Sequence, residues 1–122
     1  MATHGLAHRD RLERVVGHLL QNAAEATPPD GRIGVRLSRA EDGGARIEVR
    51  DTGRGMSDSF VRQRLFRPFE STKPHGMGIG AFESREYVRE LGGTLHVESR
   101  EGTGTVFRIA LPAFAEQAAL PA

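Results

Sequence analysis

The sequence of 122 residues contains no cysteine, which excludes disulfide bonds, thiolate catalysis and cysteine-ligated metal sites. It also has no apolar run approaching the roughly 20 residues of a membrane span, and its N-terminus lacks the apolar core of a signal peptide. Seventeen basic and sixteen acidic residues leave a net charge of +1, so bulk charge favours neither a nucleic-acid nor a membrane-surface partner. We therefore expect a cytoplasmic domain without direct membrane contact, whether or not a longer protein carries a membrane anchor.

The composition is ordinary for a globular domain, with 38% hydrophobic and 27% charged residues. The pattern along the chain predicts one domain over residues 9–112. Residues 1–8 are expected to be disordered or an artificial start, and residues 113–122 a C-terminal tail.

Hydrophobic periodicity predicts a helix over residues 9–26 that ends at a proline-rich turn. Strict alternation over 33–38 and 45–50, with a glycine turn between them, predicts an antiparallel hairpin. After a loop-rich insertion, the pattern predicts a helix over 81–91 and a second hairpin ending at residue 111. This order indicates an α/β two-layer sandwich, a mixed sheet with helices packed on one face.

A glycine-rich loop precedes the second predicted helix. Gly76, Gly78 and Gly80 alternate with other residues, so their backbone amides can converge on an anion at the helix N-terminus, and Lys73 adds a positive charge. The stretch also satisfies the dinucleotide pattern G-x-G-x-x-A, but no strand leads directly into it, and no P-loop motif is present. The loop alone therefore indicates either a polyphosphate site or a flexible linker.

Four further features accompany the loop, and each has a structural explanation when taken alone. They are a helical stripe (His18, Asn22, Glu25), a D-x-G-x-G turn (Asp51, Gly53, Gly55), a phenylalanine pair (Phe66, Phe69) and a G-T-x-F edge (Gly104, Thr105, Phe107). In this order and spacing the motifs closely resemble the ATP-binding domain of sensor histidine kinases, within the GHKL superfamily, which implies the Bergerat-type fold. The sequence of residues 80–86 looks most like that of the exosortase-associated sensor kinases.

The resemblance implies a site for Mg²⁺ and ATP. It assigns the metal to the side-chain oxygen of Asn22, which suits a cation that prefers oxygen ligands. The exocyclic amine of adenine needs an acceptor, for which Asp51 is the candidate, assisted by Thr105. Residues 56–75 would form a mobile lid anchored by two phenylalanines. The complete candidate set for binding Mg²⁺-ATP is Asn22, Asp51, Gly53, Gly55, Phe66, Phe69, Lys73, Gly76, Met77, Gly78, Ile79, Gly80 and Thr105.

The candidate catalytic residues are His18, Asn22 and Lys73. In the hydrolytic branches of the superfamily a glutamate stands where this chain has His18, so the histidine favours a kinase over a fast ATPase. His18 either orients a metal-bound water or the incoming acceptor, or is a neutral, hydrogen-bonded structural residue. Glu25 either pairs with a neighbouring arginine or acts in catalysis. Glu83 and Ser84 replace aliphatic residues that the family usually has, so packing there is expected to differ.

The resemblance predicts transfer of the γ-phosphate of Mg²⁺-ATP to a histidine on a separate dimerisation (histidine-phosphotransfer) domain of the same kinase. A response regulator would be an indirect partner. Residues 1–8 are expected to be too short to build the phosphorylated hairpin of such kinases, and neither His4 nor His8 is expected to be the acceptor. The alternatives are an anti-sigma-factor-like serine kinase or binding module of the same fold, and a degenerate domain without nucleotide.

Overall fold

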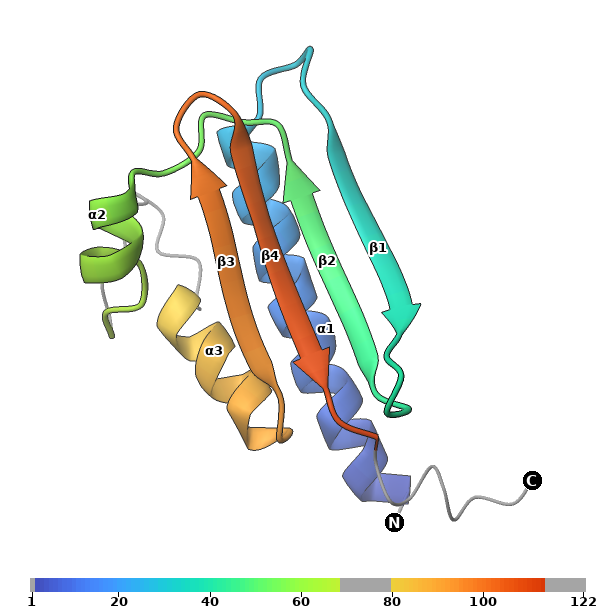
Figure 1. Cartoon of the computed structure of the whole chain (residues 1–122). Coiled ribbons are helices and arrows are strands. Elements are labelled where there is room, and N and C mark those ends of the chain that lie inside the picture. Colours follow the sequence, from blue (N-terminus) through green and yellow to red (C-terminus); the bar gives the residue numbers. More distant parts are fainter. Residues whose placement is uncertain (1, 69–79, 114–122) are drawn as a thin grey trace.

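The computed structural model describes residues 2–68 and 80–113 (Figure 1). Its elements, in chain order, are α1 (Ala2–Ala26), β1 (Ile33–Arg39), β2 (Ala45–Asp51), α2 (Asp58–Phe60), the π-helical turn η1 (Val61–Leu65), α3 (Ala81–Glu90), β3 (Thr94–Arg100) and β4 (Gly104–Leu111). The predicted order of elements is confirmed. Helix α1, however, begins at Ala2 instead of residue 9, and the stretch between them contains no proline that would prevent this extension.

The four strands form one sheet in the order β1-β2-β4-β3 (Figure 1). All three pairings are antiparallel, so the α/β sandwich is confirmed while the mixture of strand directions expected from the sequence is not found among the described strands. The reason is topological. Each hairpin joins neighbouring strands through a short turn, and the two hairpins meet with β2 antiparallel to β4.

Both long helices cover the same face of the sheet (Figure 1). The apolar positions of α1 and α3 pack on the inward-facing positions of the strands, and the resulting core consists of Val15, Leu19, Ala23, Ile47, Val49, Val88, Leu91, Leu95, Phe107, Ile109 and Leu111. Coverage on one face only is therefore confirmed. Within the described part of the chain, no helix has the length and apolar character to cross a membrane.

Strand β1 is an edge strand whose apolar side chains stay largely outside this core. Ile33, Val35 and Leu37 are all exposed, and Leu37 retains 72% of its accessible surface. Helix α1 packs mainly over β2, so the alternation that predicted β1 correctly does not lead to burial here.

The outward face of the sheet is charged. Arg108 on β4 donates from Nε to Glu48 Oε2 on β2 at 2.9 Å, and it also contacts the carboxylate of Glu98 on β3. One guanidinium thus connects three strands. The hydrogen bond from Arg108 is the largest cause holding the pKa of Glu48 below its ordinary value.

This pKa shift predicts how stability depends on pH. Because the folded state binds the Glu48 proton more weakly than the unfolded state, the contribution is complete above the unfolded pKa and disappears as the pH falls through the folded one. The pair is partly exposed, so we expect Glu48→Gln to lower the free energy of unfolding at neutral pH by at most about 1 kcal/mol. Urea titrations across the acid range should show the two curves converging at low pH. Curves that stay parallel would contradict the assignment.

Candidate functional site

The carboxylate of Asp51 and the hydroxyl of Thr105 lie side by side at one end of the sheet. Asp51 is the last residue of β2, and its Cα pairs with that of Thr105 in β4. Both side chains are buried and belong to the face that the helices cover. The backbone amide of Gly53 donates to Asp51 Oδ1 at 2.8 Å, which fixes the orientation of the carboxylate. Two of the predicted base-binding residues are thus brought together by strand register.

The turn after β2 packs against the C-terminal end of α1. The amide of Arg54 donates to the carbonyl of Ala26 at 3.2 Å. A Cβ at Gly53 would lie 2.4 Å from that same carbonyl oxygen, so only glycine fits. Asn22 stands one helical turn before Ala26, and the contact therefore brings Asn22 and Asp51 to the same end of the molecule.

The next glycine of the motif is required by the β3–β4 turn. Gly55 has a φ of +70°, and a Cβ there would lie 2.0 Å from the carbonyl oxygen of Arg100. The turn is held further by the amide of Gly102, which donates to the carbonyl of Arg54 at 2.8 Å. Both glycines of the D-x-G-x-G motif are therefore explained by contacts inside the protein, and their approach to a base stays a prediction.

Ser99 is a residue of this site that the sequence did not reveal. Its Oγ accepts from the amide of Met56 at 2.8 Å, donates to the carbonyl of Gly104 at 3.2 Å and lies 2.7 Å from Thr105 Oγ1. Either hydroxyl can be the donor in the contact between Ser99 and Thr105. In both cases the Thr105 hydroxyl retains a lone pair that can accept a further hydrogen bond.

The helical stripe on α1 is linked to α3. His18 is buried, and its Nδ1 lies 3.0 Å from the Oγ of Ser84, a fully buried residue of α3. Its Nε2 lies 3.4 Å from Nδ2 of Asn22, which is half-buried. Glu25 is exposed and accepts a hydrogen bond from Gln21 at 3.4 Å, so both interpretations of Glu25 stay open.

The N-terminus of α3 is capped by its own acidic side chain. Glu83 Oε1 accepts from the amide of Gly80 at 2.9 Å, and the negative charge lies in the first turn, where it complements the helix dipole. A phosphate at the Gly80 amide would have to displace this carboxylate. Glu83 and Ser84, the two residues expected to change the packing of this helix, thus each make a defined hydrogen bond.

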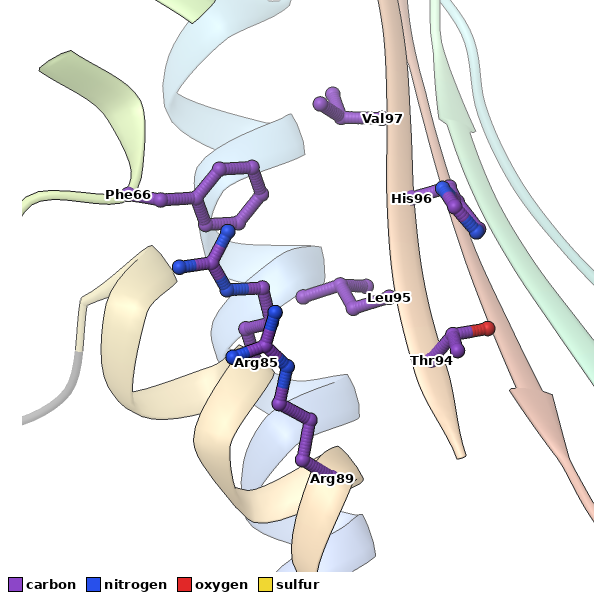
Figure 2. A pocket seen from close by; sticks show the side chains of 7 residues that line it. All are labelled: Phe66, Arg85, Arg89, Thr94, Leu95, His96 and Val97. Atoms are coloured by element: carbon purple, nitrogen blue, oxygen red, sulfur yellow. The ribbon is translucent and has the colours of Figure 1, made fainter. Parts of the chain in front are cut away.

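Phe66, at the end of η1, is half-buried against the core, and the guanidinium of Arg85 stacks 4.3 Å from the centre of its ring. Both side chains line a hollow of about 310 Å³ between α3 and β3, and Figure 2 shows them with the other lining residues. Phe66 is the only predicted nucleotide-binding residue among those lining the hollow: Phe66, Arg85, Arg89, Thr94, Leu95, His96 and Val97. The hollow is therefore distinct from the end where Asp51 and Thr105 lie.

Part of the predicted site lies outside the described residues. This holds for Phe69, Lys73, Gly76, Met77, Gly78 and Ile79. Their roles in anchoring the lid and binding phosphate stay predictions.

Comparison with known proteins decides the family. The model of the family described as histidine kinase-, DNA gyrase B- and HSP90-like ATPase matches residues 7–115. The chain belongs to this family. The C4-dicarboxylate transport sensor protein DctB of Rhizobium meliloti is 44% identical over 108 residues, which cover 87% of this chain and 17% of that protein. Sporulation kinase E of Bacillus subtilis is 38% identical over 84% of this chain and 14% of its own length.

Solved structures agree with these relatives. The catalytic domain of the histidine kinase ThkA superposes with a TM-score of 0.74 at 31% identity, over 89% of this chain and 70% of that one. The mycobacterial sensor histidine kinase MprB superposes with a TM-score of 0.72 at 34% identity, over 84% of this chain and 70% of that one. The chain is thus an ATP-binding catalytic domain of the sensor histidine kinase type, and it spans about a sixth of the curated relatives named above. The finer resemblance to exosortase-associated kinases stays a prediction.

Replacing Ser99 tests how the base end of the site is held. Ser99→Ala leaves the Met56 amide without its acceptor, which should lower the free energy of unfolding by about 1–2 kcal/mol. Urea denaturation measures the loss. The exposed Ser38→Ala, on β1, is the matched control and should change stability by less than about 0.5 kcal/mol. Equal effects of the two substitutions would show that the Ser99 hydroxyl does not hold the turn.

Proposed function

We propose that this domain binds Mg²⁺-ATP at the end of the sandwich where α1, β2 and β4 meet. In the longer protein, the γ-phosphoryl group would then pass to a histidine on a separate dimerisation domain, and a response regulator would receive it later. The observation that carries this proposal is the packing of the Asp51–Gly53 turn on Ala26. That contact supports the proposal because it joins the turn after Asp51, the candidate ligand for the base, to the end of the helix that carries Asn22, the candidate ligand for the metal.

Adenine recognition requires a buried acceptor facing an exocyclic amine. One oxygen of Asp51 accepts from the Gly53 amide, and among the described residues no other donor bonds this carboxylate. Its second oxygen is therefore suited to the adenine amine. The Thr105 hydroxyl, held by Ser99, offers a further acceptor for the base or for a bridging water.

The residues present fit a magnesium ion better than a metal held mainly by protein. Mg²⁺ keeps several waters and takes one or two protein oxygens together with substrate phosphates. Within the described residues, no three histidine, aspartate or glutamate side chains gather in a metal-binding cluster. Asn22, on a helix fixed by core packing, would supply the protein ligand, and the ion would neutralise phosphate charge during transfer.

The remaining parts of the proposed site lie at the start of α3 and in the segment before it. Lys73 and the backbone amides of residues 76–80 would bind the phosphates. Phe66 is suited to anchor the lid, because its ring contacts both the core and Arg85. Phosphoryl transfer needs mainly positioning and charge stabilisation, and these groups would supply both.

The surroundings of His18 support a kinase over a hydrolase. An ATPase needs a base that can take a proton from water. Here the position is occupied by an imidazole whose two nitrogens lie within hydrogen-bond distance of Ser84 and Asn22. The relatives are also named as sensors and kinases, which favours histidine phosphorylation over the anti-sigma-factor alternative.

Nucleotide binding is tested with Asp51→Asn. Asparagine retains an oxygen for the Gly53 amide, so the fold should persist, but it removes the charged acceptor proposed for adenine. We expect Mg²⁺-ATP to raise the melting temperature of the wild-type chain by ligand linkage. Calorimetry should give an affinity at least about tenfold lower for the variant, as expected for a hydrogen bond to a charged group. The exposed Asp30→Asn is the control, and unchanged affinity in Asp51→Asn would refute the adenine assignment.

The proposed acceptor is tested by phosphotransfer. The 122-residue chain, incubated with radiolabelled Mg²⁺-ATP and the histidine-bearing dimerisation hairpin of a related sensor kinase, should label the hairpin. Phosphohistidine is labile in acid and stable in base, so the label should be lost on acid treatment. A hairpin whose acceptor histidine is replaced by glutamine is the control. An acid-stable label would point to serine phosphorylation instead.

A further inference from the structure

Three side chains from two helices form a hydrogen-bonded series next to the proposed metal ligand. Ser84 on α3 lies 3.0 Å from Nδ1 of His18 on α1, and Nε2 of the same ring lies 3.4 Å from Nδ2 of Asn22. Ser84 is fully buried and His18 nearly so, and solvent therefore competes little for these contacts. The series runs from the helix that follows the glycine loop to the amide expected to bind the metal.

The chemistry of the three groups fixes the direction of the hydrogen bonds. The Nδ2 atom of Asn22 can only donate, so Nε2 of His18 must accept. The imidazole is then neutral, with its proton on Nδ1, and that proton is donated to Ser84 Oγ. A single tautomer is consistent with both contacts.

The same contact shows which end of the Asn22 carboxamide faces the ring. Because the amide nitrogen is held toward His18, the amide oxygen lies on the side of the carboxamide that faces away from the ring. A cation is attracted by the amide oxygen and repelled by the NH₂ group, so an amide that rotates by half a turn loses its use as a ligand. The hydrogen bond to His18 selects the useful orientation in advance.

We propose that His18 and Ser84 are positioning residues that orient the Asn22 carboxamide so that its oxygen serves as the protein ligand of Mg²⁺-ATP. The proposal rests on the function proposed above, and it assigns His18 an indirect role through Asn22. Ser84 contributes by accepting the Nδ1 proton and so fixing the tautomer. The serine thus belongs to the metal end of the proposed site.

The first measurement uses the wild-type chain. Two-bond ¹⁵N–¹H correlations of the imidazole distinguish a proton on Nδ1 from one on Nε2. We expect the Nδ1–H tautomer of His18 at neutral pH, with and without Mg²⁺-ATP, and its assignment comes from the spectrum of His18→Gln. An Nε2–H tautomer would make the ring a donor to Asn22 and would overturn the proposal.

The second measurement separates positioning from general destabilisation. Ser84→Ala removes one oxygen from a buried site, and ATP affinity is measured by calorimetry in Mg²⁺ and in EDTA. We expect the gain in affinity due to Mg²⁺ to fall about threefold to tenfold, the worth of one hydrogen bond, while the affinity in EDTA is unchanged. Ser84→Thr, which restores a hydroxyl, should recover the gain. An equal loss in both conditions would indicate a structural role only and overturn the proposal.

A double-mutant control tests whether the effect of Ser84→Ala on Mg²⁺-dependent affinity acts through the Asn22 carboxamide. In an Asn22→Ala background, adding Ser84→Ala should not change the Mg²⁺-dependent gain further, because the group being oriented is gone. A further loss in this background would show that Ser84 acts by another route. If the wild-type chain binds no ATP, or Asn22→Ala leaves the Mg²⁺ dependence intact, the proposed function fails as well. If only the Ser84 effect is independent of metal, this inference alone fails.

Discussion

The geometry of the site depends on one close backbone contact. The carbonyl of Ala26, at the end of α1, accepts the amide of Arg54 and leaves no room for a side chain at Gly53. A helix packed on a sheet can otherwise slide and rotate by small amounts without losing apolar burial, since the hydrophobic effect is non-directional. A hydrogen bond across a glycine contact removes that freedom. It fixes the distance between the helix that carries Asn22 and the strand that ends in Asp51.

The sequence predicted the fold well wherever the signal was periodic. The 3.6-residue and two-residue patterns gave the helices and hairpins and placed the inward faces correctly. Strand direction across the sheet was predicted less well, because it depends on how the two hairpins meet and not on either hairpin alone. The predicted start of α1 at residue 9 was also wrong, since residues 2–8 carry no strong signal for or against a helix. The exposed β1 shows the same limit, because alternation indicates a face but not what covers it.

The candidate site was predictable from motifs to the extent that motif residues meet through the backbone. Asp51 and Thr105 meet by strand register, and the Gly53 amide binds the carboxylate two residues away. The residues that support them were missed because their partners are distant in sequence. The sequence contains one indication of Ser99, a hydroxyl at an inward position of β3. Its hydrogen bonds to Met56 and Thr105 arise only when the turn after β2 packs against the turn between β3 and β4.

The two ends of the proposed nucleotide site are held by different kinds of support. The base end rests on β2, β3 and β4 and on the turn after β2, through the hydrogen bonds of Gly53 to Asp51 and of Met56 to Ser99. The metal end rests on a contact between two helices, since Ser84 on α3 is linked to Asn22 on α1 through His18. Ser84 is four residues after Gly80, whose amide is bound by Glu83. A movement of the α3 N-terminus that accompanies phosphate binding would therefore be transmitted to the metal ligand, while the base end would keep its geometry.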